Sequence, residues 1–183
     1  MTTAKCPIND NVTFRATKAD GSVKQLFEYN QLGFYNLQKG MAVPRTPEYG
    51  RYVDELVTHN LVTSAGKAAV AGRLIANTPS AWSHIAIGSG IIAPVASDTT
   101  LGTEITTLGG ARAVATTGLI TTDVTNDTAQ YVVTFTFTGS VTVSETGLFN
   151  AGVAGDMLAR VLKGPASFVS GETLTVTWRI DVD

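Results

Sequence analysis

The sequence has few of the residues on which disulfide-bonded and catalytic proteins depend. Among its 183 residues there is one cysteine and there are two histidines. A single cysteine excludes an intrachain disulfide framework and a zinc site built on cysteines, and the position of Cys6 near a terminus predicts an exposed free thiol. His59 and His84 leave little scope for nucleophilic or metal chemistry. We therefore expect no cofactor and no bound metal.

Charge is also scarce. Charged residues make up 15% of the chain, against about 25% in an average soluble domain. The formal net charge of −2 lacks the basic excess that nucleic-acid binding requires, so no nucleic-acid partner is expected. A surface with few charges suits packing against neighbouring subunits, because fewer charged groups must lose their hydration at the interface.

Long apolar runs are absent as well. No stretch approaches the roughly 18 apolar residues of a membrane span, and the first residues lack the apolar centre of a signal peptide. We therefore expect no membrane partner. The expected protein is made in a cytosol and either stays soluble or leaves as part of a larger particle.

Residues 61–183 are instead rich in threonine, valine, alanine and glycine. In residues 130–138 and 173–182 threonine alternates with apolar residues, which is the period of a strand with one face toward a core. Turn signals separate six such segments, which predicts a mainly β fold: an antiparallel β-sandwich or small barrel-like domain with one α-helix and an extended N-terminal arm. The six predicted strands are residues 82–87, 111–122, 130–138, 141–149, 157–163 and 173–182.

The predicted helix covers residues 65–76. Thr63 or Ser64 is suited to cap its first turn, and small apolar residues recur at helical spacing. Residues 77–79, which end in proline, follow it.

The first third of the chain has a different character. Residues 12–18 and 23–29 predict a hairpin with Asp20-Gly21 in its turn. Residues 30–51 mix aromatic residues with glycine and proline at no regular period, and residues 52–58 could begin a strand. We expect residues 1–60 to form a hairpin and an extended arm that packs on a neighbouring subunit, and residues 61–183 to form the helix and the β-sandwich. The alternative for the arm is a long loop folded back on the same domain.

Three motifs invite a chemical interpretation, and each has a structural alternative. Gly88-Ser89-Gly90 lacks the third glycine, the lysine and the helix start of a phosphate-binding loop, which favours a turn. Ser83-His84 and Ser144-Glu145 lack the ordered nucleophile, base and acid of a hydrolase, and no Gly-x-Ser-x-Gly elbow occurs. The chain is therefore not expected to be an enzyme.

Two further groups of polar residues could have either a functional or a purely structural role. Asp123, Asn126 and Asp127 could supply oxygen ligands to Ca²⁺, but Asn-Asp is also common in turns, where both side chains bond the local backbone; the turn is favoured. Glu104 and Arg112 flank two glycines and are expected to pair across a hairpin, as an exposed ion pair that contributes under about 1 kcal/mol.

Eight segments of the chain form a pattern that recurs in a known family: residues 60–70, 85–90, 97–104, 124–129, 135–139, 145–151, 157–160 and 171–178. With these segments the chain from Leu61 onward resembles a family of tailed-bacteriophage virion proteins. The resemblance covers about two thirds of the chain in the family's order, and residues 1–60 match less well. The family has no catalytic residues, and its members carry labels that range from head decoration to tail fibre.

The resemblance implies a virion structural protein made in the host cytoplasm. The expected role is that of a capsid decoration or cement protein on the capsid exterior, bound to the major capsid protein and to other copies of itself, as a trimer. The alternative is a tail, baseplate or tail-fibre component for host attachment, with Trp82 as an aromatic platform. Interface anchors are often aromatic, and the predicted ones are Phe27, Tyr29, Phe34, Tyr35, Tyr49 and Tyr52.

Overall fold

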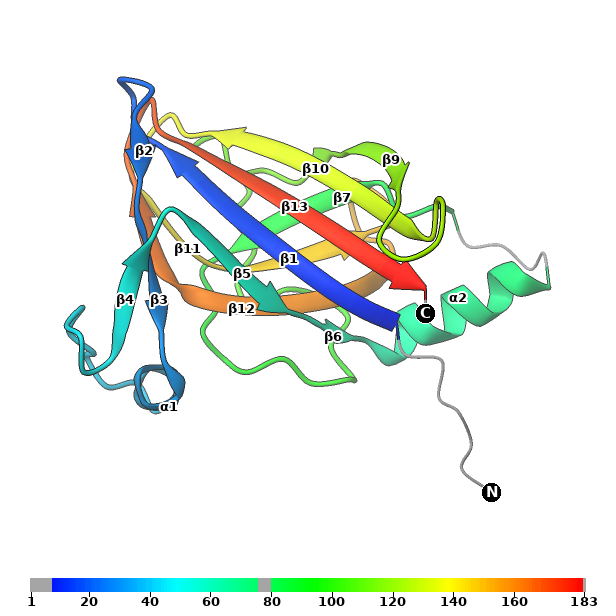
Figure 1. Ribbon diagram of the computed structural model, residues 1–183, viewed down its shortest axis with the longest axis horizontal. Helices are drawn as coiled ribbons and strands as arrows, with labels where there is room; N and C mark the ends of the chain where they lie inside the picture. Colours follow the sequence, from blue (N-terminus) through cyan, green and yellow to red (C-terminus); the bar gives the residue numbers. More distant parts are fainter. Residues whose placement is uncertain (1–7, 76–79, 183) are drawn as a thin grey trace.

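The computed structural model describes residues 8–75 and 80–182, which are built mainly from two antiparallel sheets packed face to face (Figure 1). The first sheet has the order β2–β1–β13–β10–β9, with β5 also paired to β1. Its strands are β1 (Ile8–Thr17), β2 (Val23–Lys24), β5 (Glu55–His59), β9 (Thr116–Ile120), β10 (Thr128–Thr136) and β13 (Thr173–Val182).

The second sheet has the order β6–β12–β11–β7–β8. Its strands are β6 (Leu61–Val62), β7 (His84–Gly88), β8 (Ala113–Val114), β11 (Val141–Phe149) and β12 (Met157–Phe168). A small third sheet pairs β3 (Leu26–Tyr29) with β4 (Gly50–Val53), and the helices are α1 (Gln31–Gln38) and α2 (Ser64–Leu74). The expected sandwich class is confirmed, and the sheets do not close into a barrel.

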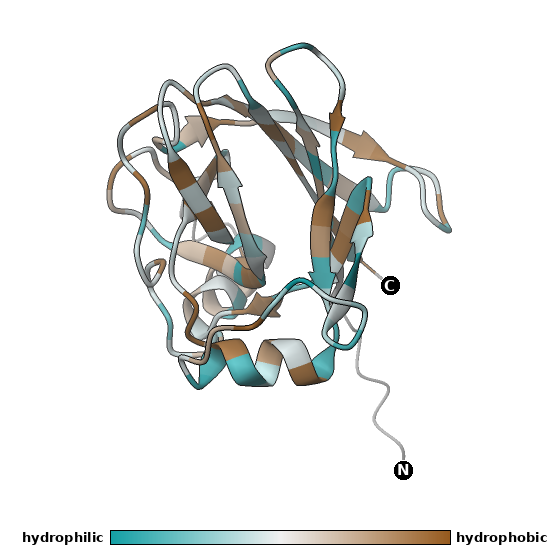
Figure 2. Ribbon diagram, turned by 90° about the vertical axis from the view of Figure 1, so that its left-hand side faces the viewer, coloured by the Kyte–Doolittle hydropathy of each residue, from teal (hydrophilic) through white to brown (hydrophobic). Residues whose placement is uncertain are grey.

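Alternation along the strands builds the core between the sheets. On β13, Leu174, Val176 and Trp178 are fully buried, whereas the threonines between them are half-buried. Apolar and polar residues alternate along several strands in Figure 2. The largest side chains that complete this core come from both sheets: Phe14, Ile85, Ile87, Phe135, Phe137, Leu148 and Phe168.

Strand β1 lies inside the first sheet rather than in an arm. It pairs with β13 over its whole length, from Ile8 opposite Val182 to Thr17 opposite Thr173. Its other edge pairs with β5 and, beyond that, with β2. The expected boundary at residue 60 therefore falls within a continuous sandwich, and the hairpin between β1 and β2 is part of it. Gly21 occupies the turn with a φ of 83°, a backbone conformation that favours glycine.

Helix α2 packs against β12. Thr63 caps it, because its Oγ1 accepts the N–H of Gly66 at 2.9 Å. A Cβ on Gly66 would lie 2.2 Å from the carbonyl oxygen of Leu158, so glycine permits this close approach. The expected helix is confirmed through Leu74, whereas its expected end at residues 76–79 lies outside the described residues, as does Cys6.

Helix α1 corrects the expectation of an irregular segment over residues 30–51. Asn30 caps this helix by accepting the N–H of Gly33. A Cβ on Gly33 would lie 2.6 Å from the carbonyl oxygen of Tyr49, so a residue that weakens isolated helices is here required by packing. Residues 8–75 and 80–182 therefore contain two helices, and α1 with β3 and β4 projects to one side of the sandwich in Figure 1.

Candidate functional site

The densest polar cluster in the described structure surrounds Glu145 on β11. This carboxylate is fully buried, and it accepts three backbone N–H groups, from Gly90 at 2.9 Å, Gly102 at 3.1 Å and Thr103 at 2.8 Å. All three donors belong to the long connection between β7 and β8. Burying a carboxylate is costly unless its oxygens are hydrogen-bonded, and here the connection supplies those hydrogen bonds.

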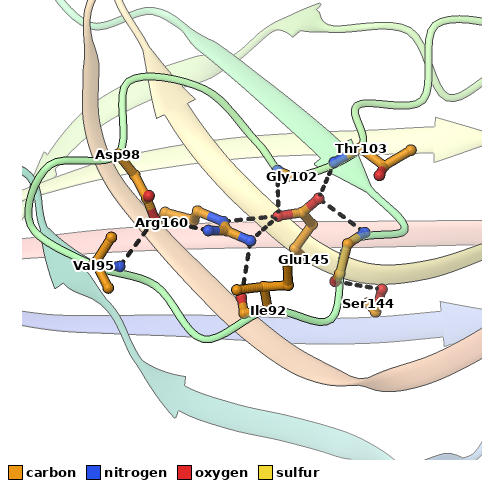
Figure 3. A network of polar contacts seen from close by, with 9 residues as sticks. Ile92, Val95, Asp98, Gly102, Thr103, Ser144, Glu145 and Arg160 are labelled. Atoms are coloured by element: carbon orange, nitrogen blue, oxygen red, sulfur yellow. Dashed lines mark hydrogen bonds and ion pairs between the residues drawn. The ribbon is translucent and has the colours of Figure 1, made fainter. Parts of the chain in front are cut away.

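Arg160 on β12 lies beside Glu145 (Figure 3). Its Nε donates to Glu145 Oε2 at 2.8 Å, and its Nη1 donates to Asp98 Oδ2 at 2.7 Å. Its Nη2 donates to the carbonyl oxygen of Ile92 at 3.0 Å. One guanidinium therefore bridges two carboxylates and a backbone carbonyl, which suits its planar set of donors.

Asp98 completes the cluster from the same connection. Desolvation acts to raise the pKa of Asp98, but the hydrogen bond from the N–H of Val95 and the neighbouring Arg160 guanidinium outweigh it, so the pKa is lowered. Asp98 therefore stays ionised, and the buried cation of Arg160 has two anionic partners.

Two glycines leave room for Glu145. A Cβ would lie 2.5 Å from Glu145 Oε1 at Gly88 and 2.4 Å from it at Gly90. The Ser144 hydroxyl donates to the carbonyl oxygen of Gly90 at 2.9 Å. The two glycines of the Gly-Ser-Gly motif therefore allow the Glu145 carboxylate to approach closely. Ser144 and Glu145 both form hydrogen bonds with Gly90, so these two residues have a structural role.

A second small core lies under this connection, on the side of the second sheet away from the first. It consists of Ala86, Leu101, Phe149 and Met157. The Arg112 guanidinium lies 3.6 Å from the centre of the Phe149 ring, a distance that gives a cation–π contact.

Arg112 also forms the expected pair with Glu104, at 2.8 Å. It donates to the carbonyl oxygens of Ala151 and Ala154 as well. The pair is therefore not the exposed one predicted, because the Arg112 side chain is 7% exposed. Its position over Phe149 and its hydrogen bonds to the loop between β11 and β12 explain the burial.

The geometry of the cluster supports a structural task. The two Glu145 oxygens and the three guanidinium nitrogens of Arg160 all have partners within the chain. These groups pin the connection between β7 and β8 onto the outer face of the second sheet. Sequence reasoning missed the cluster, because its members come from three separate segments, the β7–β8 connection, β11 and β12.

Lys163 is a second buried charge that sequence reasoning missed. It lies on β12 where the pairing with β11 shifts, between Glu145 opposite Leu162 and Val143 opposite Ala166. Its Nζ donates to the carbonyl oxygens of Val143 at 2.8 Å and Gly164 at 3.2 Å. Burial and, to a smaller extent, the charge of Arg45 lower the pKa of Lys163 to about 7. The Lys163 amine therefore donates hydrogen bonds to backbone carbonyl groups at the bulge between β11 and β12.

The structure divides the six predicted interface aromatics into three groups of two, by their exposure. Phe27 and Tyr29 are buried in their own chain, where their ring centres lie 4.7 Å apart; Tyr29 also packs against Gly164. Phe34 and Tyr49 are half-buried. Tyr35 and Tyr52 are 57% and 52% exposed, which leaves them available to a partner.

Trp82 does not offer the exposed platform expected of a fibre-tip module. It is buried, with the Arg73 guanidinium 5.7 Å from its ring centre. Beside it, Ser83 Oγ lies 2.9 Å from His84 Nδ1. The Ser83 hydroxyl therefore forms a hydrogen bond with the ring of the adjacent His84. A catalytic triad also needs a third group that orients the histidine, and the described contacts of His84 include no such group.

The Asp127 carboxylate organises its own loop. It accepts the N–H groups of Val124 at 2.6 Å and of Thr122 and Asp123 at 2.9 Å each. The hydrogen bonds from Val124 and Thr122 hold the pKa of Asp127 well below its usual range. Asn126 adopts a φ of 64°, which asparagine tolerates in turns. Both oxygens of Asp127, one of the two carboxylates of the candidate calcium site, are therefore engaged by backbone donors.

Within residues 8–75 and 80–182, no three histidine, cysteine, aspartate or glutamate side chains gather as metal ligands would. In the same residues, neither helix has the length and apolar character to cross a membrane.

Comparison of the chain with protein-family models, with curated proteins and with solved structures found no match in any of the three.

Proposed function

We propose that this chain is a structural protein of a tailed-bacteriophage virion, which decorates or cements the capsid by binding the major capsid protein. The observation that carries the proposal is the contrast between buried and exposed groups. The clustered charges around Glu145 and Arg160 are engaged inside the fold, whereas the exposed surface of α1 and β4 presents tyrosines. Such a molecule is suited to binding rather than to chemistry.

The resemblance to phage virion proteins supplies the setting. Four of its segments, residues 85–90, 97–104, 145–151 and 157–160, meet in the Glu145–Arg160 cluster. The segments that carry the resemblance therefore include the residues of a polar cluster that stabilises the fold. Residues that select a partner are expected elsewhere, which is consistent with the weaker match of residues 1–60.

The proposed docking surface consists of Leu32, Tyr35, Met41 and Tyr52, on α1, on β4 and in the connection between them. Each is about half exposed or more, from 48% at Leu32 to 57% at Tyr35. Aromatic side chains are frequent energetic centres of interfaces. Many copies bound to one shell add their modest affinities, and binding to the assembled state stabilises it by mass action. The proposed partners are the major capsid protein and further copies of this chain, which assemble on the capsid exterior as a trimer.

Copy number per virion distinguishes the head from the tail. Quantitative mass spectrometry of purified virions is expected to find hundreds of copies, as a repeated shell requires. About a dozen copies or fewer would indicate a tail or baseplate component, since cyclic assemblies there have few subunits, and would overturn the decoration role. The buried position of Trp82 favours the head, because that residue was the aromatic platform expected of a tail module.

The docking surface is tested with the double variant Tyr35→Ser/Tyr52→Ser. Deleting residues 1–50 would remove β1 and unfold the sandwich, so point variants are the appropriate probe. We expect occupancy on capsids stripped of this protein to fall at least about tenfold, since loss of two anchors removes 1.4 kcal/mol or more. Val153→Ser, at a residue 87% exposed in a different loop, is the matched control. Equal binding by both variants would contradict the assignment.

A further inference from the structure

Strand β9 is an unprotected sheet edge. Proteins usually blunt edge strands with charge, proline or short length, because unpaired N–H and C=O groups recruit other strands. The other terminal strands of the two main sheets follow this rule: β2, β6 and β8 have two residues each, and β5 carries Glu55 at its start, paired with Arg15. Strand β9 has five residues. Among the described residues it pairs with β10 alone.

The sequence around β9 lacks both usual forms of protection. Residues 113–122 contain no charged residue and no proline. Apolar side chains are left in the open there, with Val114 71% exposed and Leu119 64% exposed. Leu119 is opposite Ala129 of β10, so its exposure lies at the rim of the sandwich rather than on a separate loop. Such a segment is suited to strand pairing.

We infer that β9 pairs antiparallel with β9 of a second copy of this chain, which joins two first sheets into one continuous sheet. The occupant follows from the charge pattern: an uncharged strand can face its own copy with no like charges opposed. A two-fold axis at Gly118 would place Thr117 opposite Leu119 of the second copy and Thr116 opposite Ile120. A Cβ on Gly118 meets nothing within 4 Å, so no side chain covers the face of the sheet at the centre of the strand, and its edge away from β10 has no partner strand among the described residues.

The inference is independent of the proposed function, and the contact would link two copies whether or not they also form larger clusters. Two-fold contacts use the same surface on both partners. The backbone hydrogen bonds of the new ladder would supply affinity, and Leu119 and Ile120 would lose exposure to water.

The test combines sedimentation velocity with hydrogen exchange over a range of protein concentrations. Wild type is expected to form a concentration-dependent dimer, in which those amides of residues 116–120 that face away from β10 gain protection only at high concentration. Each of the variants Leu119→Lys and Thr117→Lys places two lysines diagonally across the paired strands, within reach of each other, and should weaken the dimer at least about tenfold. Thr134→Lys, at an exposed residue of β10, is the matched control and should still dimerise.

Circular dichroism shows whether each variant keeps its fold, and the exchange measurement on wild type needs no variant. A wild type that stays monomeric overturns the inference. So does any oligomer that forms without protection of residues 116–120, or one that both lysine variants leave unchanged.

Discussion

Lys163 is a cation inside an apolar sandwich, and its hydrogen bonds go to backbone carbonyl groups rather than to a carboxylate. Burial lowers its pKa to about 7, whereas in the unfolded chain the pKa is about 10.4. Below pH 7 both states bind the proton. Between about pH 7 and pH 10 the unfolded chain binds more protons, so the free energy of unfolding rises with pH in this window.

Replacing Lys163 with methionine should remove this pH dependence. We expect the wild-type free energy of unfolding to rise by up to about 1.4 kcal/mol per pH unit between pH 8 and pH 10, relative to the variant. Urea unfolding at several pH values measures the difference. Lys67→Met, at an exposed position of α2, should keep the wild-type slope. Equal slopes for wild type and Lys163→Met would contradict a deprotonating Lys163.

At the scale of elements, the connection between β7 and β8 is held by one carboxylate. In Glu145→Gln an amide NH₂ would replace an oxygen that accepts backbone N–H groups, and Arg160 would lose a buried partner. Breaking a buried pair of this kind costs about 3–5 kcal/mol. Thermal unfolding should show that loss, and hydrogen exchange should show faster exchange at Gly90, Gly102 and Thr103.

The matched control is Glu55→Gln, which removes the carboxylate of the exposed Arg15–Glu55 pair. An exposed pair contributes about 1 kcal/mol or less, so this variant should keep nearly all of the wild-type stability. If both variants lost the same free energy of unfolding, the network around Glu145 would not be what holds the connection between β7 and β8 in place.

Elements with an unbroken alternation could be predicted from the sequence, and interrupted ones could not. The expected strand at residues 173–182 coincides with β13, which buries one face along most of its length. The expected strand at residues 141–149 coincides with β11, although both faces of β11 are buried from Val143 onward. Strand β12 continues beyond its expected end at residue 163 to Phe168. Gly164 and Pro165 suggest a break, yet the structure keeps them in a bulge capped by Lys163.

The polar network had no local signal from which it could be predicted. Glu145 and Arg160 are ordinary polar residues in their own segments, and their partners come from the connection that precedes β8. The aromatic residues gave a partial signal. Their number in the first third predicts packing on a neighbouring subunit or on the same domain, and only the fold separates buried Phe27 from exposed Tyr35.

For the whole molecule, the sandwich is expected to fold as one cooperative unit. A fragment of residues 61–183 would lack β1, so Val12, Phe14 and Ala16 would be missing from the core and β13 would lose a neighbour along its whole length. We expect this fragment to be unfolded by near-ultraviolet circular dichroism, and the full chain to unfold in a single transition. A folded fragment would show that residue 60 is a true domain boundary.

The pairing of β1 with β13 also sets the order of events in folding. These neighbours lie at nearly opposite ends of the chain, with Ile8 opposite Val182, so their ladder closes a loop that contains almost all other residues. Closing so long a loop costs chain entropy before its contacts contribute, and folds dominated by distant pairings form slowly. On a ribosome, the first sheet would wait for the final strand, with β1 exposed to other chains until then.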